Sequence, residues 1–586
     1  MKILYRAAAY GFRHKLLITG SYASTFSATF LGLLTPLLLG SSIDSVIDSG
    51  VSSRLWLYGG AVLLVAFLRS MSTYAQSFLS EAVSQRAAFD IRNDFFRKLQ
   101  HLSFGFYDKH QTGNLMSRAT SDIENIRGWA SGGLLQIFTI TFTVISVSAI
   151  LFTTNWKLTL VSLSVTPIVG RLFGKGMPKR LNDMWHKVQV ETGHMTTVLQ
   201  ENLTGMRVVK AFGGRQFEQA KFKDKSVIVA DETYHANALQ ISRGAIMTFV
   251  YTGVTGALLL VGGMEVADGR LTPGELATFL LMTNQILNPV RQLSGVITNV
   301  SRTMAAGNRV FEILDAISPV EEKKNAIVLP RAKGKVKFDH VSLSYDGKAA
   351  ALDDIDFEVE PGQLVAILGG PGAGKSSLVH LIPRFYDATK GRITVDGTDI
   401  RDVTLNSLRT NVGIVQQDVF MFAATIKENI AYGLEGASMD DIERASKIAQ
   451  LHNYIMTLPH DYDTWVGERG ITLSGGQRQR LAIARTVLLD PPILVLDDST
   501  ASVDAHTEAL IQQALGEVVN GRTTFVIAHR LSSIRRANLV LVLEHGKIVE
   551  RGTHQELMAL GGFYRKIYDL QFRPQEEKAA QNPAVH

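Results

Sequence analysis

The chain has 586 residues, no cysteine and a formal net charge of +6. This length predicts two to four domains, and the lack of cysteine excludes disulfides and cysteine-ligated metals. The sequence contains neither the Lys/Arg blocks of nucleic-acid-binding arms nor the short apolar core and cleavage site of a signal peptide, so we expect no nucleic-acid partner. Hydrophobic residues make up 46% of the chain, an average over two unlike halves that meet near residue 300.

Apolar stretches in the first half are long enough to cross a bilayer. Three of them carry no charge, namely residues 16–43, 128–156 and 244–264. Three others are interrupted by charge: 55–80 contains Arg69, 158–178 contains Arg171 and Lys175, and 276–301 contains Arg291. Hydropathy by itself leaves several topologies open.

Flanking charges predict the orientation of these spans. Four basic residues, Lys2, Arg6, Arg13 and Lys15, precede the first span, which indicates a cytoplasmic N-terminus. The segments 82–127 and 179–243 are rich in Lys and Arg and belong on the same side. Six spans satisfy this pattern and return the second half of the chain to the cytoplasm.

Proline is absent from residues 37–166 and 179–272, so helices there can extend well beyond the bilayer. The second helix, from about residue 55 to Leu102, would be about 70 Å long at 1.5 Å per residue. We expect two helical projections into the cytoplasm that turn at 106–114 and near 211–215, where Gly and Asn permit a reversal. The two tips are either ordinary hairpins or levers that dock on the second half.

Arg69 is predicted to lie about 21 Å along the second span, far from both interfaces. An ionisable group at that depth faces a cavity or pairs with a partner. Helix pairing and substrate contact both remain open for Arg69. Arg171 and Lys175 are expected to snorkel to the inner interface.

The second half begins after a Pro- and charge-rich linker, 318–334, and then alternates strands and helices. An apolar strand, Leu364–Leu368, runs into Gly369-Gly370-Pro371-Gly372-Ala373-Gly374-Lys375-Ser376 and a helix, which is the arrangement of a phosphate-binding loop, or P-loop. Its backbone N–H groups and the helix N-terminus can cradle phosphates. Lys375 would reach the β- and γ-phosphates, and the Ser376 hydroxyl would ligate Mg²⁺. Pro371 removes one loop donor.

Paired aspartates follow a second apolar strand, Ile493–Leu496. Asp497 is placed to hold Mg²⁺ through water, and Asp498 would orient the attacking water. An efficient hydrolase would have glutamate at 498, and aspartate is one methylene shorter. Because a misplacement of about 1 Å can cost on the order of a hundredfold in rate, Asp498 predicts slow hydrolysis.

The segment Leu473-Ser474-Gly475-Gly476-Gln477 lies about a hundred residues after the P-loop and resembles the signature motif of ATP-binding cassette (ABC) proteins. Tyr345 resembles the aromatic residue that stacks on adenine, and Gln417 the Q-loop glutamine that senses Mg²⁺ and the γ-phosphate. Asp504 fits the D-loop and His529 the switch histidine. Residues 466–470 resemble an exporter-specific loop, and segments 112–127 and 201–217 look like the coupling regions of ABC exporters.

The resemblance implies three sets of site residues. Those expected to bind ATP are Tyr345, Gly369, Gly370, Gly372, Ala373, Gly374, Lys375, Ser376, Ser377, Gln417, Ser474, Gly475, Gly476, Gln477, Asp497 and Asp504. Those expected to hold Mg²⁺ are Ser376, Gln417 and Asp497. Those expected to take part in hydrolysis are Asp498, His529 and Gln417.

The resemblance covers nearly the whole chain and implies half of an ABC exporter in a bacterial cell membrane, with its nucleotide-binding domain in the cytoplasm. The expected fold is a six-span helical domain over 1–317 with long cytoplasmic extensions, coupling regions at 106–127 and 201–217, and a linker over 318–334. An α/β P-loop ABC domain over 335–572 and a disordered tail over 573–586 complete it. ATP and Mg²⁺ are the expected cofactors.

Several functions remain compatible with these motifs. In ABC exporters one cassette's signature closes over the nucleotide of another, so the chain is expected to pair with a second half-transporter. Asp498 favours a heterodimer in which this chain supplies the slow, degenerate site, and a homodimer with two Asp-based sites is the alternative. An ATP-gated channel or regulator and an importer with the exporter fold also fit. The uncharged spans argue against a soluble ATPase of DNA repair or translation. An amphiphile, a lipid or a hydrophobic drug is the substrate that the family implies.

Overall fold

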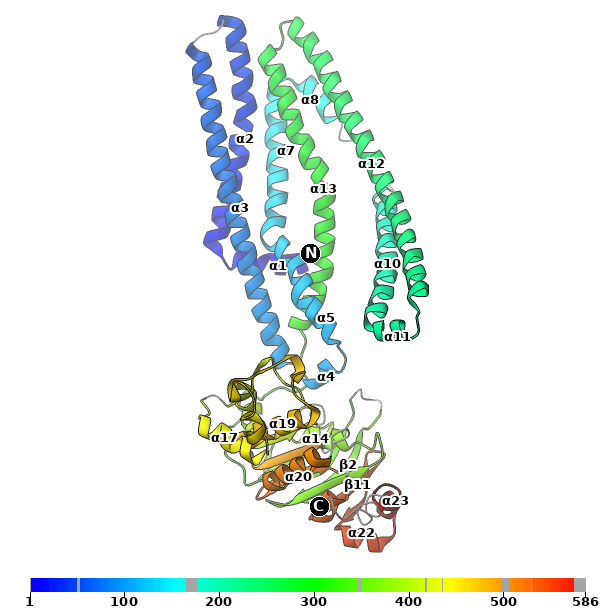
Figure 1. The fold of residues 1–586 in the computed structure, drawn as a ribbon. Coiled ribbons are helices and arrows are strands. Elements are labelled where there is room, and N and C mark those ends of the chain that lie inside the picture. The colour runs from blue at the N-terminus through cyan, green and yellow to red at the C-terminus, as the bar shows by residue number, and fades with distance from the viewer. Residues whose placement is uncertain are drawn as a thin grey trace. The chain divides into compact units, whose positions relative to one another are not determined.

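The computed structural model describes all residues except 1, 50–52, 165–176, 346, 348, 417–418, 435, 498–504, 529 and 574–586. It divides into two compact units (Figure 1). The first unit contains Met1–Lys98 and Leu115–Asp315, and the second contains Leu99–Asn114 and Ala316–His586.

The first unit is helical, as the sequence predicts. Its longer helices are α1 (Lys2–Phe12), α2 (Lys15–Ser49), α3 (Ser53–His101), α7 (Leu134–Thr154), α8 (Trp156–Leu163), α10 (Met177–Thr204), α12 (Arg215–Ala267) and α13 (Pro273–Leu314). Between α3 and α7 lie the short helices α5 (Thr112–Ser117) and α6 (Ile123–Gly128) and the π-helical turns η1 (Arg118–Asp122) and η2 (Trp129–Gly133). The prediction of a second helix from about residue 55 to 102 is confirmed by α3.

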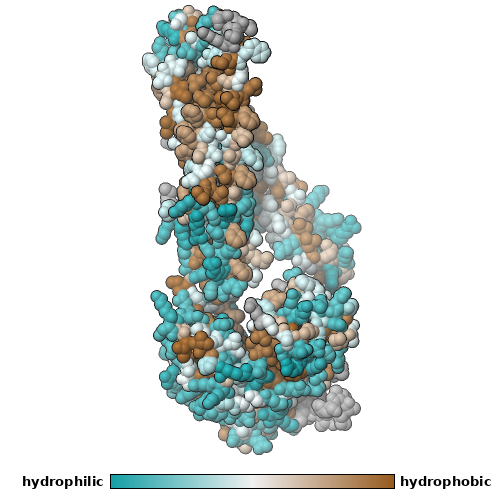
Figure 2. Space-filling model, turned by 90° about the vertical axis from the view of Figure 1, so that its left-hand side faces the viewer, coloured by the Kyte–Doolittle hydropathy of each residue, from teal (hydrophilic) through white to brown (hydrophobic). Residues whose placement is uncertain are grey.

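Four helical stretches among the described residues are long and apolar enough to cross a membrane, namely Lys15–Asp48, Leu55–His101, Thr112–Thr154 and Arg215–Ala267. Figure 2 shows a hydrophobic band near one end of the helical unit and more hydrophilic surface toward the other end. The predicted span 276–301 lies within α13. The predicted span 158–178 lies partly outside the described residues, together with Arg171 and Lys175, and the side chain of Arg291 is also outside them. The count of six spans therefore stays a prediction.

The third predicted span, 128–156, ends earlier than its hydropathy suggests. Asn155 has an extended backbone (φ −156°, ψ 110°), and its side chain accepts hydrogen bonds from the N–H groups of Lys157 and Leu158. It thereby caps α8, and α7 ends at Thr154. An apolar count cannot detect this break, because a single N-cap residue ends the helix without introducing charge.

Polar and small residues join α2 to α13. Asp44 accepts hydrogen bonds from the Gly274 N–H (2.7 Å) and the Thr272 hydroxyl (2.6 Å), and so caps the start of α13. The two helices approach closely beside this cap, since a Cβ atom on Gly40 would lie 2.5 Å from the Gly274 carbonyl oxygen. Small residues let helix backbones come this near inside a membrane.

Arg69 lies on α3 against α2, where a Cβ atom on Gly32 would be 3.3 Å from the guanidinium carbon. The carbonyl of Gly32 also accepts a hydrogen bond from Gln285 Nε2 of α13 (3.1 Å). Arg69 is exposed. It therefore contacts a neighbouring helix while its surface stays accessible, and both sequence interpretations remain open.

Both predicted tips are present, although the first reverses at other residues than expected. Gly113 and Asn114 lie inside α5, so their assignment to the turn was wrong. The chain instead turns through Ser103, the short helix α4 (Phe104–Tyr107) and residues 108–111, held by hydrogen bonds such as that from Asp108 N–H to Phe104 O (3.0 Å). At the second tip α11 (Met206–Ala211) ends and Gly213 adopts φ +64° before α12 begins.

The second unit is an α/β domain with two larger sheets and one two-stranded sheet, which confirms the predicted fold class. Its main sheet has the order β12-β11-β3-β10-β9-β6 and is parallel except for β12. The second, antiparallel sheet has the order β2-β1-β4-β5. The strands of the main sheet are β3 (Leu364–Gly369), β6 (Val412–Val415), β9 (Ile493–Asp497), β10 (Thr523–Ile527), β11 (Leu539–Glu544) and β12 (Lys547–Gly552). The strands of the second sheet are β1 (Val336–Leu343), β2 (Leu352–Val359), β4 (Lys390–Val395) and β5 (Thr398–Asp399).

The helices of this unit pack on the main sheet or on one another, and many of their apolar side chains are buried in the core. They are α14 (Lys375–Leu381), α15 (Leu405–Asn411), α16 (Ile426–Ile430), α17 (Met439–Ile448), α18 (His452–Ile455), α19 (Gly475–Leu489), α20 (Ala505–Val519), α21 (Leu531–Arg536), α22 (His554–Leu560) and α23 (Phe563–Ile567). A small antiparallel pair of strands, β7 (Ala424–Thr425) and β8 (Trp465–Val466), leads into the exporter-like loop.

The predicted linker is attached to this domain along part of its length. Leu329 and Ala332 are buried, and their N–H groups donate to the side chains of Ser407 (3.0 Å) and Asn411 (2.7 Å). The segment that composition predicts to be a linker is therefore an irregular segment that packs on the domain.

Candidate nucleotide site

The P-loop connects β3 to α14 through a turn that requires glycine. Gly374 has φ +99°, and a Cβ atom there would lie 2.7 Å from the carbonyl oxygen of Ala351. Gly372 has φ +75° with open space around it, and Gly370 is also unobstructed. The loop therefore leaves an uncovered backbone concavity before the N-terminus of α14, which is the shape that a polyphosphate needs.

Lys375 is the first residue of α14. Its Nζ donates to the carbonyl oxygens of Gly369 and Gly370, both at 2.9 Å. Burial lowers the pKa of this ammonium group, and the negative charge of Asp497 acts in the opposite direction. This influence of Asp497 on Lys375 is expected if both side chains face one phosphate site.

The other P-loop residues differ in how accessible they are. Ser376 is exposed, whereas Ala373 is buried. The Ala373 N–H donates to Gly370 O (3.2 Å) and its carbonyl accepts from the Gly546 N–H (3.2 Å). Ala373 therefore shapes the loop from within, and its N–H already has an acceptor in the protein.

Tyr345 lies beside the P-loop helix although it precedes β2 in the sequence. Its hydroxyl donates to Ser377 Oγ at 2.9 Å. The ring is about half exposed. An exposed aromatic face next to a phosphate cradle suits a nucleotide base, as the resemblance implies.

The signature segment caps a helix. Ser474 is the N-cap of α19: its Oγ accepts from the Gln477 N–H, and Gln477 Oε1 accepts from the Ser474 N–H at 2.8 Å. Nothing lies within 4 Å of a Cβ placed on Gly475, whereas Gly476 is buried. The helix N-terminus thus presents an open, uncharged surface to an anionic group.

The register of the parallel strands shows where the remaining candidates emerge. Asp497 at the end of β9 pairs with Ile527 of β10, which in turn pairs with Ile367 of β3, two residues before Gly369. Segments that follow these strands therefore leave the sheet at one edge, where ligands of α/β proteins bind. Asp498, Asp504 and His529 follow these strands but lie outside the described residues, as does Gln417.

The second unit also holds a cluster of aromatic residues that sequence reasoning missed. Phe104 of α4 stacks on Phe385 with ring centroids 4.1 Å apart. The Tyr386 hydroxyl donates to the Asp108 carboxylate at 2.7 Å. The Tyr386 ring also meets Tyr345 edge-on at 4.9 Å, so one residue touches both the candidate adenine platform and the helix tip.

Burial dominates the electrostatics of this cluster. It raises the pKa of Tyr386 well above its ordinary value, and the hydrogen bond to Asp108 adds to the shift. Tyr386 therefore remains a hydrogen-bond donor over the physiological pH range. Burial also lowers the pKa of the adjacent His380, which favours its neutral form. The feature of the sequence that could have indicated this cluster is the pair Phe385-Tyr386, shortly after the P-loop helix.

Two known families match this chain. The family described as ABC transporter transmembrane region matches residues 19–290, and the family described as ABC transporter matches residues 352–501.

Relatives match over nearly the full length. The chain is 37% identical to the uncharacterized ABC transporter ATP-binding protein YknU of Bacillus subtilis (strain 168), over 98% of both chains. It is 36% identical to an ATP-dependent lipid A-core flippase of Syntrophus aciditrophicus (strain SB), over 96% of this chain and 94% of the relative. It is also 36% identical to a putative multidrug export ATP-binding/permease protein, YgaD, of Bacillus subtilis (strain 168), over 92% of this chain and 94% of the relative.

A solved structure of a bacterial Atm1-family ABC exporter with ATP bound superposes with a TM-score of 0.78. The two chains are 29% identical, and the match covers 97% of this chain and 98% of the other.

Proposed function

The chain belongs to the ABC exporters, and we propose that it is the slow-hydrolysing half of a heterodimer that moves amphiphilic small molecules or lipids out of the cell. It is a membrane protein that carries an ATP-binding ABC domain on the cytoplasmic side and couples ATPase activity to transport. The observation that carries the proposal is the combination of a complete P-loop and signature segment with the aspartate pair Asp497-Asp498, which begins at the last residue of β9.

ATP would be held by the P-loop and by the base-stacking face of Tyr345. Lys375 would exchange the hydrogen bonds from its Nζ to the two loop carbonyls for bonds to phosphate oxygens. The exposed Ser376 hydroxyl, Asp497 and Gln417 would hold Mg²⁺, which neutralises phosphate charge when bound. Oxygen donors of this kind suit that ion.

The signature segment supports a second, similar chain as partner. The open N-terminus of α19 at Gly475 is a surface for the nucleotide of another cassette, since the chain has its own P-loop at a different place in the domain. Two half-transporters would then enclose two nucleotides, and closure would move the membrane helices.

The identity of residue 498 supports unequal rates of ATP hydrolysis at the two nucleotide sites of that pair. An aspartate there retains a carboxylate but reaches about one methylene less far, which costs rate by misplacing the attacking water. The chain's intact signature would complete an active site on a partner that carries glutamate. A homodimer with two slow sites is the alternative, and in both arrangements this chain binds ATP.

The relatives and Arg69 support an amphiphilic substrate. One relative is a lipid A-core flippase and another a putative multidrug exporter. Arg69 places an accessible cation among apolar helices beside Gly32. A substrate with an apolar body and an anionic group would suit that surface.

The test is ATPase activity of the purified chain without a partner, compared with its Asp498→Glu variant. We expect very low activity that rises by one to two orders of magnitude in the variant, on the order of the cost of a misplaced reacting group. Asp498→Asn is the matched control and should stay inactive. Substantial activity of the wild-type chain, little changed by Asp498→Glu, would refute the degenerate-site proposal.

A further inference from the structure

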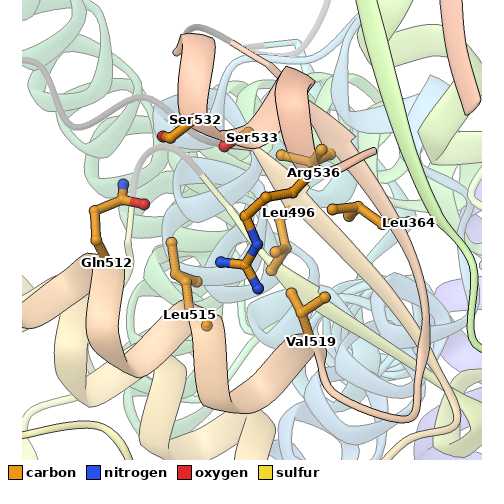
Figure 3. Close-up of a pocket in the computed structure, with 10 residues that line it drawn as sticks. Leu364, Leu496, Gln512, Leu515, Val519, Ser532, Ser533 and Arg536 are labelled. Atoms are coloured by element: carbon orange, nitrogen blue, oxygen red, sulfur yellow. The ribbon is translucent and has the colours of Figure 1, made fainter. Parts of the chain in front are cut away.

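A hollow in the second unit lies away from the P-loop, on the face of the main sheet that α20 and α21 cover (Figure 3). Its cavity volume is about 60 Å³. Leu364, Leu496 and Val526 of the strands form one wall, and Leu515 and Val519 of α20 form another. A cavity of this size holds about four water molecules or a small ligand group.

Hydrogen-bond donors without acceptors line the polar side of this hollow. Gln512 Nε2 is inaccessible to solvent and has no hydrogen-bond partner among the described residues. Arg536 is exposed, and its guanidinium points from α21 toward α20 (Figure 3) without an ion pair or hydrogen bond to the described part of the chain. The Ser532 hydroxyl lies at the rim.

An unpaired buried donor is costly, about 1–3 kcal/mol for an amide. Native proteins keep few such groups, and each calls for a partner. Here the buried Gln512 amide donor and the exposed Arg536 cation face the same small space, so a ligand that accepts hydrogen bonds and carries negative charge satisfies both. A carboxylate or a phosphate meets both demands.

The remaining walls define the rest of the ligand. The strand side chains and Leu515 and Val519 of α20 offer only carbon, which suits a short alkyl or aromatic body. Gly516 leaves space beside the guanidinium, since a Cβ atom there would lie 3.7 Å from Arg536 Nη1. The hollow therefore fits an anionic group with a few apolar carbons and excludes a nucleotide or a whole lipid.

We propose that this hollow is a binding site for a small anionic amphiphile, a carboxylate or phosphate monoester with a short apolar body. Its oxygens accept from Arg536 and Gln512, and its carbons pack on Leu515 and Val519. Occupancy links α20 to α21, the helices that follow the D-loop candidate Asp504 and the candidate switch His529 in the sequence. Such a ligand then alters ATP hydrolysis. This consequence rests on the proposed function, whereas the binding of the ligand does not depend on it.

Binding is tested by calorimetric titration of the full-length protein in detergent with hexanoate and with hexyl phosphate. Hexanol and hexylammonium are the uncharged and cationic controls. We expect saturable binding of at least one anion and none of either control, and the two anions separate carboxylate from phosphate recognition. Arg536→Gln should weaken binding about tenfold or more, the loss of one strong charged contact. Gln512→Leu should abolish it by filling the polar side with carbon.

Arg551→Gln is the matched control, because it removes an exposed arginine of the same unit that lies outside the hollow. A rise in melting temperature on adding ATP shows in each variant that the domain is folded. Lack of saturable binding by both anions, or equal weakening in Arg551→Gln, overturns the site. Binding that leaves ATPase activity within about twofold overturns the regulatory consequence alone. A wild-type protein that binds hexanoate but not ATP would contradict the proposed function and leave the site standing.

Discussion

Tyr386→Phe is expected to loosen α4 from the rest of the second unit without disturbing the ring contacts around Tyr386. The phenylalanine keeps the edge-on contact with Tyr345 and loses only the hydrogen bond to Asp108, which is 2.7 Å long. A hydrogen bond to a charged group contributes about 1.5–3 kcal/mol when buried. Both partners here are partly open to water, so we take about 1 kcal/mol, or roughly a fivefold change in the docking equilibrium.

Hydrogen exchange measures this equilibrium directly. Amides that exchange through local opening do so at a rate set by the free energy of opening, so the peptide covering 99–114 should exchange about fivefold faster in Tyr386→Phe. Asp108→Asn should have a similar effect, and the double variant should be little worse than either single one, because both remove the same bond.

Tyr462→Phe serves as the matched control. It removes a tyrosine hydroxyl that bonds to His452 Nδ1 (2.8 Å) elsewhere in the unit, and exchange in 99–114 should not respond. An unchanged exchange rate in Tyr386→Phe, or fully additive effects of Tyr386→Phe and Asp108→Asn, would show that this bond does not hold α4. In the working transporter we expect Tyr386→Phe to keep ATP affinity and to lower the stimulation of ATPase by substrate.

Two further predictions concern stability. Arg309→Met should destabilise the first unit by about 2 kcal/mol, because it leaves the buried Asp122 carboxylate without the two hydrogen bonds (2.7 and 2.5 Å) that Arg309 donates. The thermal midpoint of unfolding in detergent measures this loss, and adding Asp122→Leu to the same chain should restore much of the stability. An unchanged midpoint in Arg309→Met would contradict the estimate. His380 has a folded-state pKa below its unfolded value, so it contributes stability above its unfolded pKa of about 6.5, and this is lost as the pH falls through the folded-state pKa. The unfolding midpoint of the second unit should therefore fall less between pH 7.5 and 5.5 in His380→Gln than in the wild type, and parallel curves for the two proteins would refute this linkage.

Local sequence patterns predicted much of the architecture. The long second helix, the strand before the P-loop and the strand before Asp497 follow from runs of apolar residues and the absence of proline. Placement of the first turn failed at Gly113 and Asn114, since residues that permit a reversal do not require one. The capping of α8 by Asn155 escaped notice for a related reason, because one polar residue barely changes a hydropathy average.

The candidate site likewise contains residues that the sequence predicted and contacts that it did not predict. Glycines 372 and 374, Lys375 and the Ser474 cap lie in short contiguous motifs whose spacing is visible in the chain. The contact of Tyr386 with Asp108 joins residues 278 positions apart, and nothing periodic in the sequence marks it.

The sequence by itself determined the chemistry of this protein: apolar spans, a phosphate-binding loop, and an aspartate at 498, each set by residues that are neighbours in the chain. Only the tertiary structure decided that Tyr386 contacts both Tyr345 and the tip of α4, and that Gln512 and Arg536 face one small hollow. Such contacts arise when distant elements pack to bury apolar surface, and packing selects shape and volume, which leave no short-range pattern to read.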